Sequence, residues 1–294
     1  MGEIDIKERL KNGNILLLDG AMGTQLILRG IKSGETSETW ILTRPDDVSA
    51  IHKDYFDAGA DIVLTNTFGG TPLKLSHFGL AERAEDVNRR AAELAKSVCP
   101  EGRFVAGDIG PTGKLLKPYG DADEEELFEN FKLQAKALAD GGVDLVIIET
   151  MMDLKEGELA LKAALTTELP VFACVTFDKK KRGYFTMMGN SPEDVVKSLI
   201  DLGATAVGAN CTLRIGDMVD LIKEISAVST VPVIAEPNAG SPELENGKPK
   251  YMDGPKEFAQ KVPDLISAGA VIVGGCCGTT PETTREIRKI IDSM

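Results

Sequence analysis

Short apolar runs recur along this chain, and several of them follow a helix-like segment that ends in glycine. The stretches AGADIV, GGVDLV, LGATAV and AGAVIV all follow this plan. A glycine just past a helix takes the left-handed conformation that ends it, and the next strand begins a residue or two later. Repetition of one such unit predicts a fold built from consecutive strand–helix pairs.

The apolar runs are nearly continuous rather than alternating, as expected for strands buried on both faces of a parallel sheet. Eight strands are expected, at Ile15–Leu18, Ile62–Thr65, Phe104–Gly107, Leu145–Ile148, Val171–Val175, Ala206–Ala209, Val233–Ala235 and Val271–Val273. Helical spacing predicts helices between them, at Pro45–Ala58, Ala81–Val98, Glu124–Ala139, Glu156–Glu168, Pro192–Leu202, Ile215–Ile225 and Pro255–Ala268.

The number of units and the absence of a linker decide the fold class. Eight strand–helix units in 294 residues, without a Pro/Ser-rich linker, predict an α/β fold, a single (β/α)8 TIM barrel over residues 1–294. An open, doubly wound parallel sheet is the alternative.

The charge and the cysteine content indicate which classes of partner are disfavoured and which cellular compartment is expected. The formal charge of −13 argues against a nucleic-acid or anionic-membrane partner, because phosphates would be repelled. The charged N-terminus predicts no secretory signal, and no apolar stretch is long enough for a transmembrane helix. Five scattered cysteines are typical of a reduced, cytoplasmic protein that uses some thiols for metal binding or catalysis.

Polar residues follow each expected strand. In a barrel these positions converge on one mouth, where active sites of this fold are built. The residues at these positions are Asp19, Asn66, Asp108, Glu149, Thr176, Asn210, Cys211, Glu236, Asn238, Cys276 and Cys277.

The adjacent thiols in GGCCGTTPE allow three interpretations: packed core thiols, a strained vicinal disulfide, or metal ligands. Cys211 follows the sixth strand, and Cys276 and Cys277 follow the eighth, so only one strand separates them in a barrel. Three thiolates with one open position make a plausible zinc site. Cys99 and Cys174 are expected to be structural, because buried thiols behave as small hydrophobes.

A zinc ion with three thiolates is a poor generator of hydroxide, because the ligands already donate charge to it. Such a site suits a fourth thiolate from a substrate, which loses its proton on binding and stays nucleophilic. The ligand set therefore indicates alkylation of a thiol substrate.

Seven stretches match a known family. The chain resembles the homocysteine S-methyltransferase family, in particular the N-terminal homocysteine-binding barrel of cobalamin-dependent methionine synthases. The matching stretches, in order, are LLDGAMGTQL, ADIVLTNTFGG, GDIGPTG, IIETMMDLKE, GANC, EPNAG and GGCCGTTPE. The resemblance implies Zn²⁺ bound by Cys211, Cys276 and Cys277, and L-homocysteine as the thiol that is methylated to methionine.

The resemblance also implies substrate contacts. Asp19 and Glu149 would face the homocysteine amino group, since carboxylates form charge-assisted hydrogen bonds with ammonium. The alternative for both carboxylates is helix capping or the orientation of a loop. Asn238 would complete the zinc shell when substrate is absent. The substrate carboxylate would meet backbone groups of Ala21, Met22 and Gly23.

The methyl donor and the acceptor stay open. The chain has no corrinoid-binding Asp-x-His-x-x-Gly motif, so a methyl-corrinoid donor would be carried on a separate protein or on further domains. Two mouth loops depart from the family pattern: TLRIGDM after Cys211, and GYFTMMGNSPEDV around Met187 and Met188. One alternative is therefore a methyltransferase subunit of a corrinoid system acting on another methylated substrate or thiol. The other is a non-catalytic zinc or thiol-binding barrel.

Overall fold

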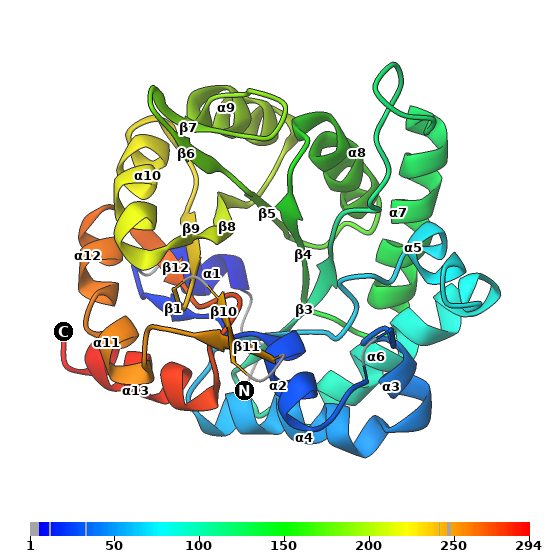
Figure 1. Ribbon diagram of the computed structural model, residues 1–294, viewed down its shortest axis with the longest axis horizontal. Coiled ribbons are helices and arrows are strands. Elements are labelled where there is room, and N and C mark those ends of the chain that lie inside the picture. Colours follow the sequence, from blue (N-terminus) through cyan, green and yellow to red (C-terminus); the bar gives the residue numbers. More distant parts are fainter. Residues whose placement is uncertain (1–5, 12, 33, 241, 246–247) are drawn as a thin grey trace.

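Eight parallel strands form the centre of the molecule, and helices surround them (Figure 1). The computed structural model describes residues 6–11, 13–32, 34–240, 242–245 and 248–294. The hydrogen-bonded order around the sheet is β1-β12-β9-β8-β5-β4-β3-β2, with every neighbouring pair parallel.

The sheet closes on itself between β1 and β2. Leu18 forms a parallel bridge with Ile62, and the Asp61 N–H donates to Leu17 O at 2.7 Å. A parallel eight-stranded sheet whose two edges meet is the (β/α)8 barrel that the repeated unit predicts, and the open doubly wound sheet is excluded.

The elements have the following bounds. The barrel strands are β1 Leu16–Leu17, β2 Ile62–Leu64, β3 Phe104–Ile109, β4 Leu145–Met151, β5 Val171–Val175, β8 Ala206–Arg214, β9 Val233–Asn238 and β12 Ala270–Val273. The helices are α1 Ile6–Lys11, α2 Met22–Leu28, α3 Thr39–Thr43, α4 Pro45–Asp57, α5 Pro72–Ser76, η1 Ala81–Arg83, α6 Ala84–Ser97, α7 Glu124–Asp140, α8 Leu154–Leu165, α9 Pro192–Leu202, α10 Ile215–Val228, α11 Pro255–Ala259, α12 Val262–Ser267 and α13 Pro281–Asp292.

The glycines that end the helices behave as the sequence predicts. Gly59, Gly142, Gly203 and Gly269 all have positive φ, between 88° and 110°, and each lies one to three positions before the first residue of a strand. One helix prediction is wrong: Pro255–Ala268 is two helices, α11 and α12. The break precedes Pro263, whose missing N–H and bulky ring cannot continue a helix but suit the first turn of a new one.

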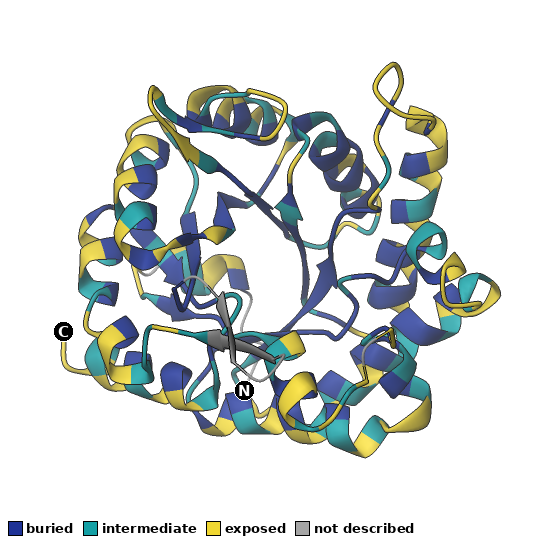
Figure 2. Cartoon of the chain, viewed as in Figure 1, coloured by how far each residue is buried: buried dark blue, intermediate teal, exposed yellow. Residues whose placement is uncertain are grey.

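The core has two layers, which explains why the strands are apolar on both faces. One cluster fills the barrel interior and includes Phe104, Phe172 and Cys174, and Ile6 of α1 belongs to it. The larger cluster lies between the strands and the helices. Figure 2 shows the barrel strands buried over most of their length, whereas the helices are buried on one side and exposed on the other. Cys174 is therefore a packing residue, as expected.

Two short hairpins are inserted after barrel strands, on the side where the strands end. Hairpin β6–β7 (Asp178–Lys180, Gly183–Phe185) follows β5, and hairpin β10–β11 (Pro242–Glu245, Lys248–Tyr251) follows β9. The GYFTMMGNSPEDV departure supplies β7 and the turn to α9, where the Met187 side chain is 54% exposed. Among the described residues, no helix has the length and apolarity needed to cross a membrane.

Charge pairing at the opposite end of the barrel centres on Asp61, which is buried. Its carboxylate accepts from the Leu17 N–H at 2.9 Å and pairs with Arg9, Arg103 and Arg288. These partners join α1, the segment before β3, and α13 to the first two strands. The far end of a barrel contributes stability rather than chemistry.

Asp61→Asn should destabilise the protein by about 2–4 kcal/mol, measured by urea unfolding. The penalty is below that of a fully buried pair because the three arginine side chains are 20–31% exposed. Asp57→Asn, which breaks an exposed pair with Lys53, should cause a much smaller loss, because solvent screens exposed charges. Equal losses in the two variants would contradict this role for Asp61.

Candidate metal and substrate site

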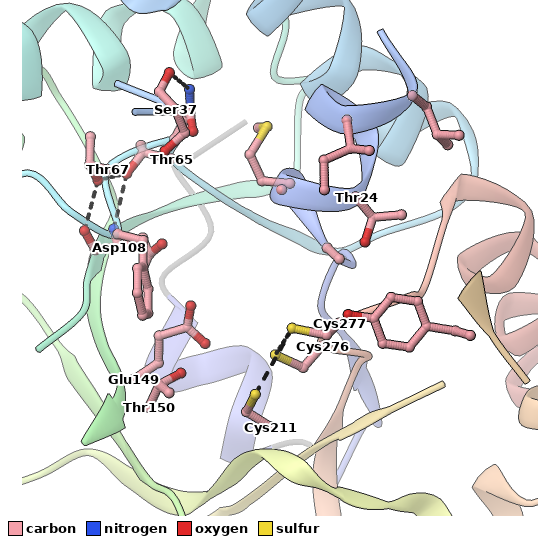
Figure 3. Close-up of a pocket in the computed structure, with 18 residues that line it drawn as sticks. Thr24, Ser37, Thr65, Thr67, Asp108, Glu149, Thr150, Cys211, Cys276 and Cys277 are labelled. Atoms are coloured by element: carbon pink, nitrogen blue, oxygen red, sulfur yellow. Dashed lines mark hydrogen bonds between the residues drawn. The ribbon is translucent and has the colours of Figure 1, made fainter. Parts of the chain in front are cut away.

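A cavity of about 370 Å³ opens at the mouth of the barrel. The ends of β2, β3, β4 and β8, the start of α2 and the loop after β12 all contribute to its wall (Figure 3). Its lining residues are Ala21, Met22, Gly23, Thr24, Ile27, Leu28, Ser37, Thr65, Asn66, Thr67, Phe68, Asp108, Glu149, Thr150, Cys211, Tyr251, Cys276 and Cys277.

The three predicted thiols meet at one side of this cavity. The Sγ atoms of Cys211, Cys276 and Cys277 lie within 4.8 Å of one another, and Cys277 Sγ is 4.0 Å from each of the other two. Figure 3 shows the sulfurs converging from β8 and from the loop after β12. All three thiols are free, and 4.0 Å is about twice the length of a disulfide bond. The three cysteines also line a cavity, which does not fit the alternative that they are packed core thiols.

Backbone contacts hold the two adjacent cysteines in place. The Cys276 N–H donates to Pro237 O, and Cys277 O accepts from the Ala239 N–H, both at 2.9 Å. Gly278 has φ +86°, and a Cβ there would lie 2.1 Å from the Tyr251 ring. The loop therefore requires glycine at this position, and it is anchored to the end of β9.

Cys211 has a strained backbone conformation. Its φ is +61° and that of Thr212 is +45°, values that L-residues other than glycine seldom adopt. The pairing of β8 with β9 is irregular between Asn210 and Arg214, so the chain turns the Cys211 side chain toward the cavity. Such strain persists where surrounding contacts fix it, and it is concentrated at functional sites.

Hydrogen bonds among the three thiols favour a thiolate at Cys211. Hydrogen bonds from Cys276 and Cys277 lower the pKa of Cys211 to about 3, and the Asn238 amide adds a further hydrogen bond to the same sulfur. Hydrogen bonding to Cys211 in turn raises the pKa of Cys277 to about 11. The Oδ1 atom of Asn238 is buried without a partner. The cluster therefore provides a stable thiolate with an unused oxygen donor near it.

Four buried carboxyl groups surround the barrel mouth: Asp19, Asp108, Glu149 and Glu236. Burial raises the pKa of all four, and that of Glu149 reaches about 7, with a further contribution from the Cys211 thiolate. Among the side chains that the structure describes, no Lys or Arg lines the cavity. The site thus favours a cationic group, because a cation would stabilise the ionised carboxylates.

The predicted substrate residues divide into two groups. Ala21, Met22, Gly23 and Glu149 line the cavity. Asp19 is buried at the β1–β2 seam, where its Oδ2 accepts from the Leu64 N–H at 2.9 Å. That bond fits the loop-orienting alternative for Asp19, whose contact with substrate stays a prediction.

Sequence reasoning missed several lining residues. Tyr251 reaches the cavity from hairpin β10–β11 and lies against Cys277. Ser37 belongs to the segment before α3, and its carbonyl accepts from Asn66 Nδ2 at 2.9 Å. From the sequence, site residues are expected directly after the barrel strands. Neither Ser37 nor Tyr251 lies at such a position, so the sequence does not predict them.

The chain is similar in sequence to one known protein family. The family model described as homocysteine S-methyltransferase matches residues 16–291. The chain belongs to the homocysteine S-methyltransferase family.

Two methionine synthases are similar to this chain in sequence. Methionine synthases of Mycobacterium leprae (strain TN) and Mycobacterium tuberculosis (strain ATCC 25618 / H37Rv) are 32% and 33% identical over 97% and 95% of the chain. The chain spans about a quarter of the length of these relatives, since it covers 25% of each.

The homocysteine methyltransferase MmuM from Escherichia coli matches as a structure. Its metallated form has a TM-score of 0.80 at 26% identity, covering 96% of this chain and 98% of that one. Its oxidized form has a TM-score of 0.81 at 25% identity, covering 97% of this chain and 100% of that one.

Glu149→Gln should change how the stability of the metal-free protein depends on pH. The folded state holds the Glu149 proton up to about pH 7, whereas the unfolded chain releases it from about pH 4. Wild-type stability should therefore fall relative to the variant as pH rises from 5 to 8, by up to about 3 kcal/mol. Urea unfolding of both proteins with chelator checks this, and parallel pH dependences would contradict it.

Proposed function

We propose that this protein is a zinc-dependent methyltransferase that activates the thiol of L-homocysteine and transfers a methyl group to it, giving methionine. The observation that carries the proposal is the meeting of three thiols with a buried carboxylate in one cavity. The thiols suit a metal that binds sulfur, and Glu149 suits an ammonium group. An aminothiol carries both groups that this cavity complements.

The donor set fits zinc. Tetrahedral zinc with Zn–S bonds of about 2.3 Å requires sulfurs about 3.8 Å apart, close to the 4.0 Å separations from Cys277 to Cys211 and Cys276. Asn238 offers a buried, unpartnered oxygen that could complete the shell in the absence of substrate. A zinc ion held there would supply a Lewis acid that lowers the pKa of a substrate thiol and keeps its sulfur anionic.

The residues of the chain would bind and orient the substrate. Glu149 accepts a hydrogen bond from the ammonium group, and the ammonium charge would favour ionisation of the nearby Asp19, whose pKa is raised by burial and by Glu149. The N–H groups at the start of α2, at Met22 and Gly23, have no acceptor within the helix and could hold the substrate carboxylate. The Ala21 N–H is less suited, because it donates to Thr279 Oγ1 at 3.2 Å.

The methyl group would enter from the open side of the cavity. As the new S–CH₃ bond forms, the bond from the methyl group to its donor breaks, and the donor keeps that electron pair. The thiol proton has already left to solvent. The donor is a methyl-corrinoid carried elsewhere or another methylated compound, and further domains or a separate corrinoid protein would supply the former. The resemblance of the seven sequence stretches to the barrel of cobalamin-dependent methionine synthases favours the corrinoid.

Cys211→Ala and Cys276→Ala should each lose bound zinc and methyl transfer. Metal content should fall from about one ion per chain to below about a tenth, because a two-thiolate remnant binds zinc weakly. Circular dichroism should show a retained fold, since both thiols are only half-buried. Cys99→Ala, which removes a half-buried thiol at the end of α6, should keep full zinc. Full zinc and turnover in either site variant would refute the three-thiolate site.

The substrate is tested by titrating zinc-loaded protein with L-homocysteine while heat and proton release are recorded together. Saturable binding with about one proton released per site is expected, because the bound sulfur is anionic. A zinc site closed to homocysteine and to other thiols would instead support a non-catalytic barrel.

The donor is tested separately by supplying zinc-loaded protein and homocysteine with free methylcobalamin. Methionine formation is the expected result. Turnover only with another methylated compound and a corrinoid protein would favour the alternative, a methyltransferase subunit with a different substrate.

A further inference from the structure

Asn210 joins the two strand ends that carry the reactive parts of the site. Its Nδ2 donates to Glu149 Oε2 at 2.5 Å and to Thr150 Oγ1 at 2.8 Å. Its Oδ1 accepts from the Thr150 N–H at 2.8 Å. These bonds run from β8 to β4, across the intervening β5. Because Asn210 directly precedes Cys211, one side chain links the carboxylate to the strand that carries a thiol.

Both linked strand ends have unusual backbone conformations. Thr150 has φ +58° and Cys211 has φ +61°, in the left-handed region that L-residues seldom adopt. Asn210 bonds to the backbone and to the side chain of Thr150, and its own carbonyl accepts from Thr176 Oγ1 at 3.1 Å. The surrounding bonds therefore fix both conformations, as strained functional sites require.

Asn210 itself does not touch the space where a substrate would lie. It is buried and absent from the cavity lining, whereas Glu149, Thr150 and Cys211 all line the cavity. Any effect of Asn210 on a substrate must therefore act through the groups that it holds. Its role is to position them.

We propose that Asn210 sets the separation between the Glu149 carboxylate and the Cys211 sulfur, and thereby selects the length of the aminothiol. This inference rests on the proposed function. Homocysteine has two methylene groups between its α-carbon and its sulfur, and cysteine has one. If Glu149 binds the ammonium group and the thiol cluster marks the position of the sulfur, a fixed separation fits one of these lengths.

The test compares wild type with Asn210→Ser, both zinc-loaded, by calorimetric titration. The ligands are L-homocysteine, L-cysteine and 4-mercaptobutyrate, a thiol that lacks the ammonium group. Wild type should prefer homocysteine over cysteine by roughly 10- to 200-fold, the discrimination that one methylene group provides. In Asn210→Ser that ratio should fall by about tenfold or more, because Glu149 is released, while 4-mercaptobutyrate binding changes by less than about twofold.

Two further variants keep the test decisive. Asn210→Asp has nearly the same shape but lacks both N–H donors, so it should also lose selectivity even if the serine variant fails to fold. Asn130→Ser is the matched control. This half-buried amide accepts from the Leu73 N–H and donates to Glu126 O, both at 2.9 Å, and it is not among the residues that line the cavity. It should keep the wild-type ratio.

Three results would overturn the inference. An unchanged homocysteine-to-cysteine ratio in zinc-loaded Asn210 variants would show that the separation is set elsewhere. Equal weakening of all three ligands, or loss of zinc from both Asn210 variants, would show that Asn210 supports the metal ligands alone. Failure of the wild type to bind homocysteine is a different outcome, because it refutes the proposed function and this inference together.

Discussion

Parallel pairing of all eight strands is the constraint on which the site depends. Because the strands point in one direction and the sheet closes at Leu18 and Ile62, every strand ends at the same mouth. Cys211 and the Cys276–Cys277 pair lie 65 residues apart in sequence, yet only β9 separates their strands. Closure of the barrel thus brings together thiols that the chain keeps apart, and hydrogen bonds to the end of β9 hold the loop that carries two of them.

The mouth also concentrates buried carboxyl groups. Burial raises the pKa of Asp19, Asp108, Glu149 and Glu236, and the charge of Glu149 raises the pKa of the other three further. The thiolate of Cys211 adds to this charge. A cationic metal on one side and an ammonium group on the other would relieve it. The arrangement therefore disfavours an empty site and favours a ligand that carries a positive charge next to a thiol.

The sequence predicts the elements well because their signals are local. Apolar runs and the glycines that end helices define the strands within a few residues, and the order of strands in a barrel then predicts which cysteines meet. The sequence also contains the signal for the helix break, because Pro263 cannot continue a helix. The apolar spacing on both sides of this proline nevertheless favours a single helix, which is why the predicted helix is too long.

Other parts of the site depend on contacts that no local pattern encodes. Tyr251 reaches the thiols only because hairpin β10–β11 folds back over the mouth. The bonds from Asn210 to Glu149 and Thr150 join residues about 60 positions apart, and nothing next to Asn210 predicts them. The raised pKa values likewise follow from burial, which becomes visible only once the strands are packed.

The central claim is that three thiolates of the chain leave one position for the sulfur of the substrate. Zinc X-ray absorption spectroscopy tests it most directly, because the extended fine structure counts sulfur neighbours at about 2.3 Å. The account predicts three sulfurs and one lighter atom in the free protein, and four sulfurs when L-homocysteine saturates the site. An unchanged sulfur count on saturation would contradict it.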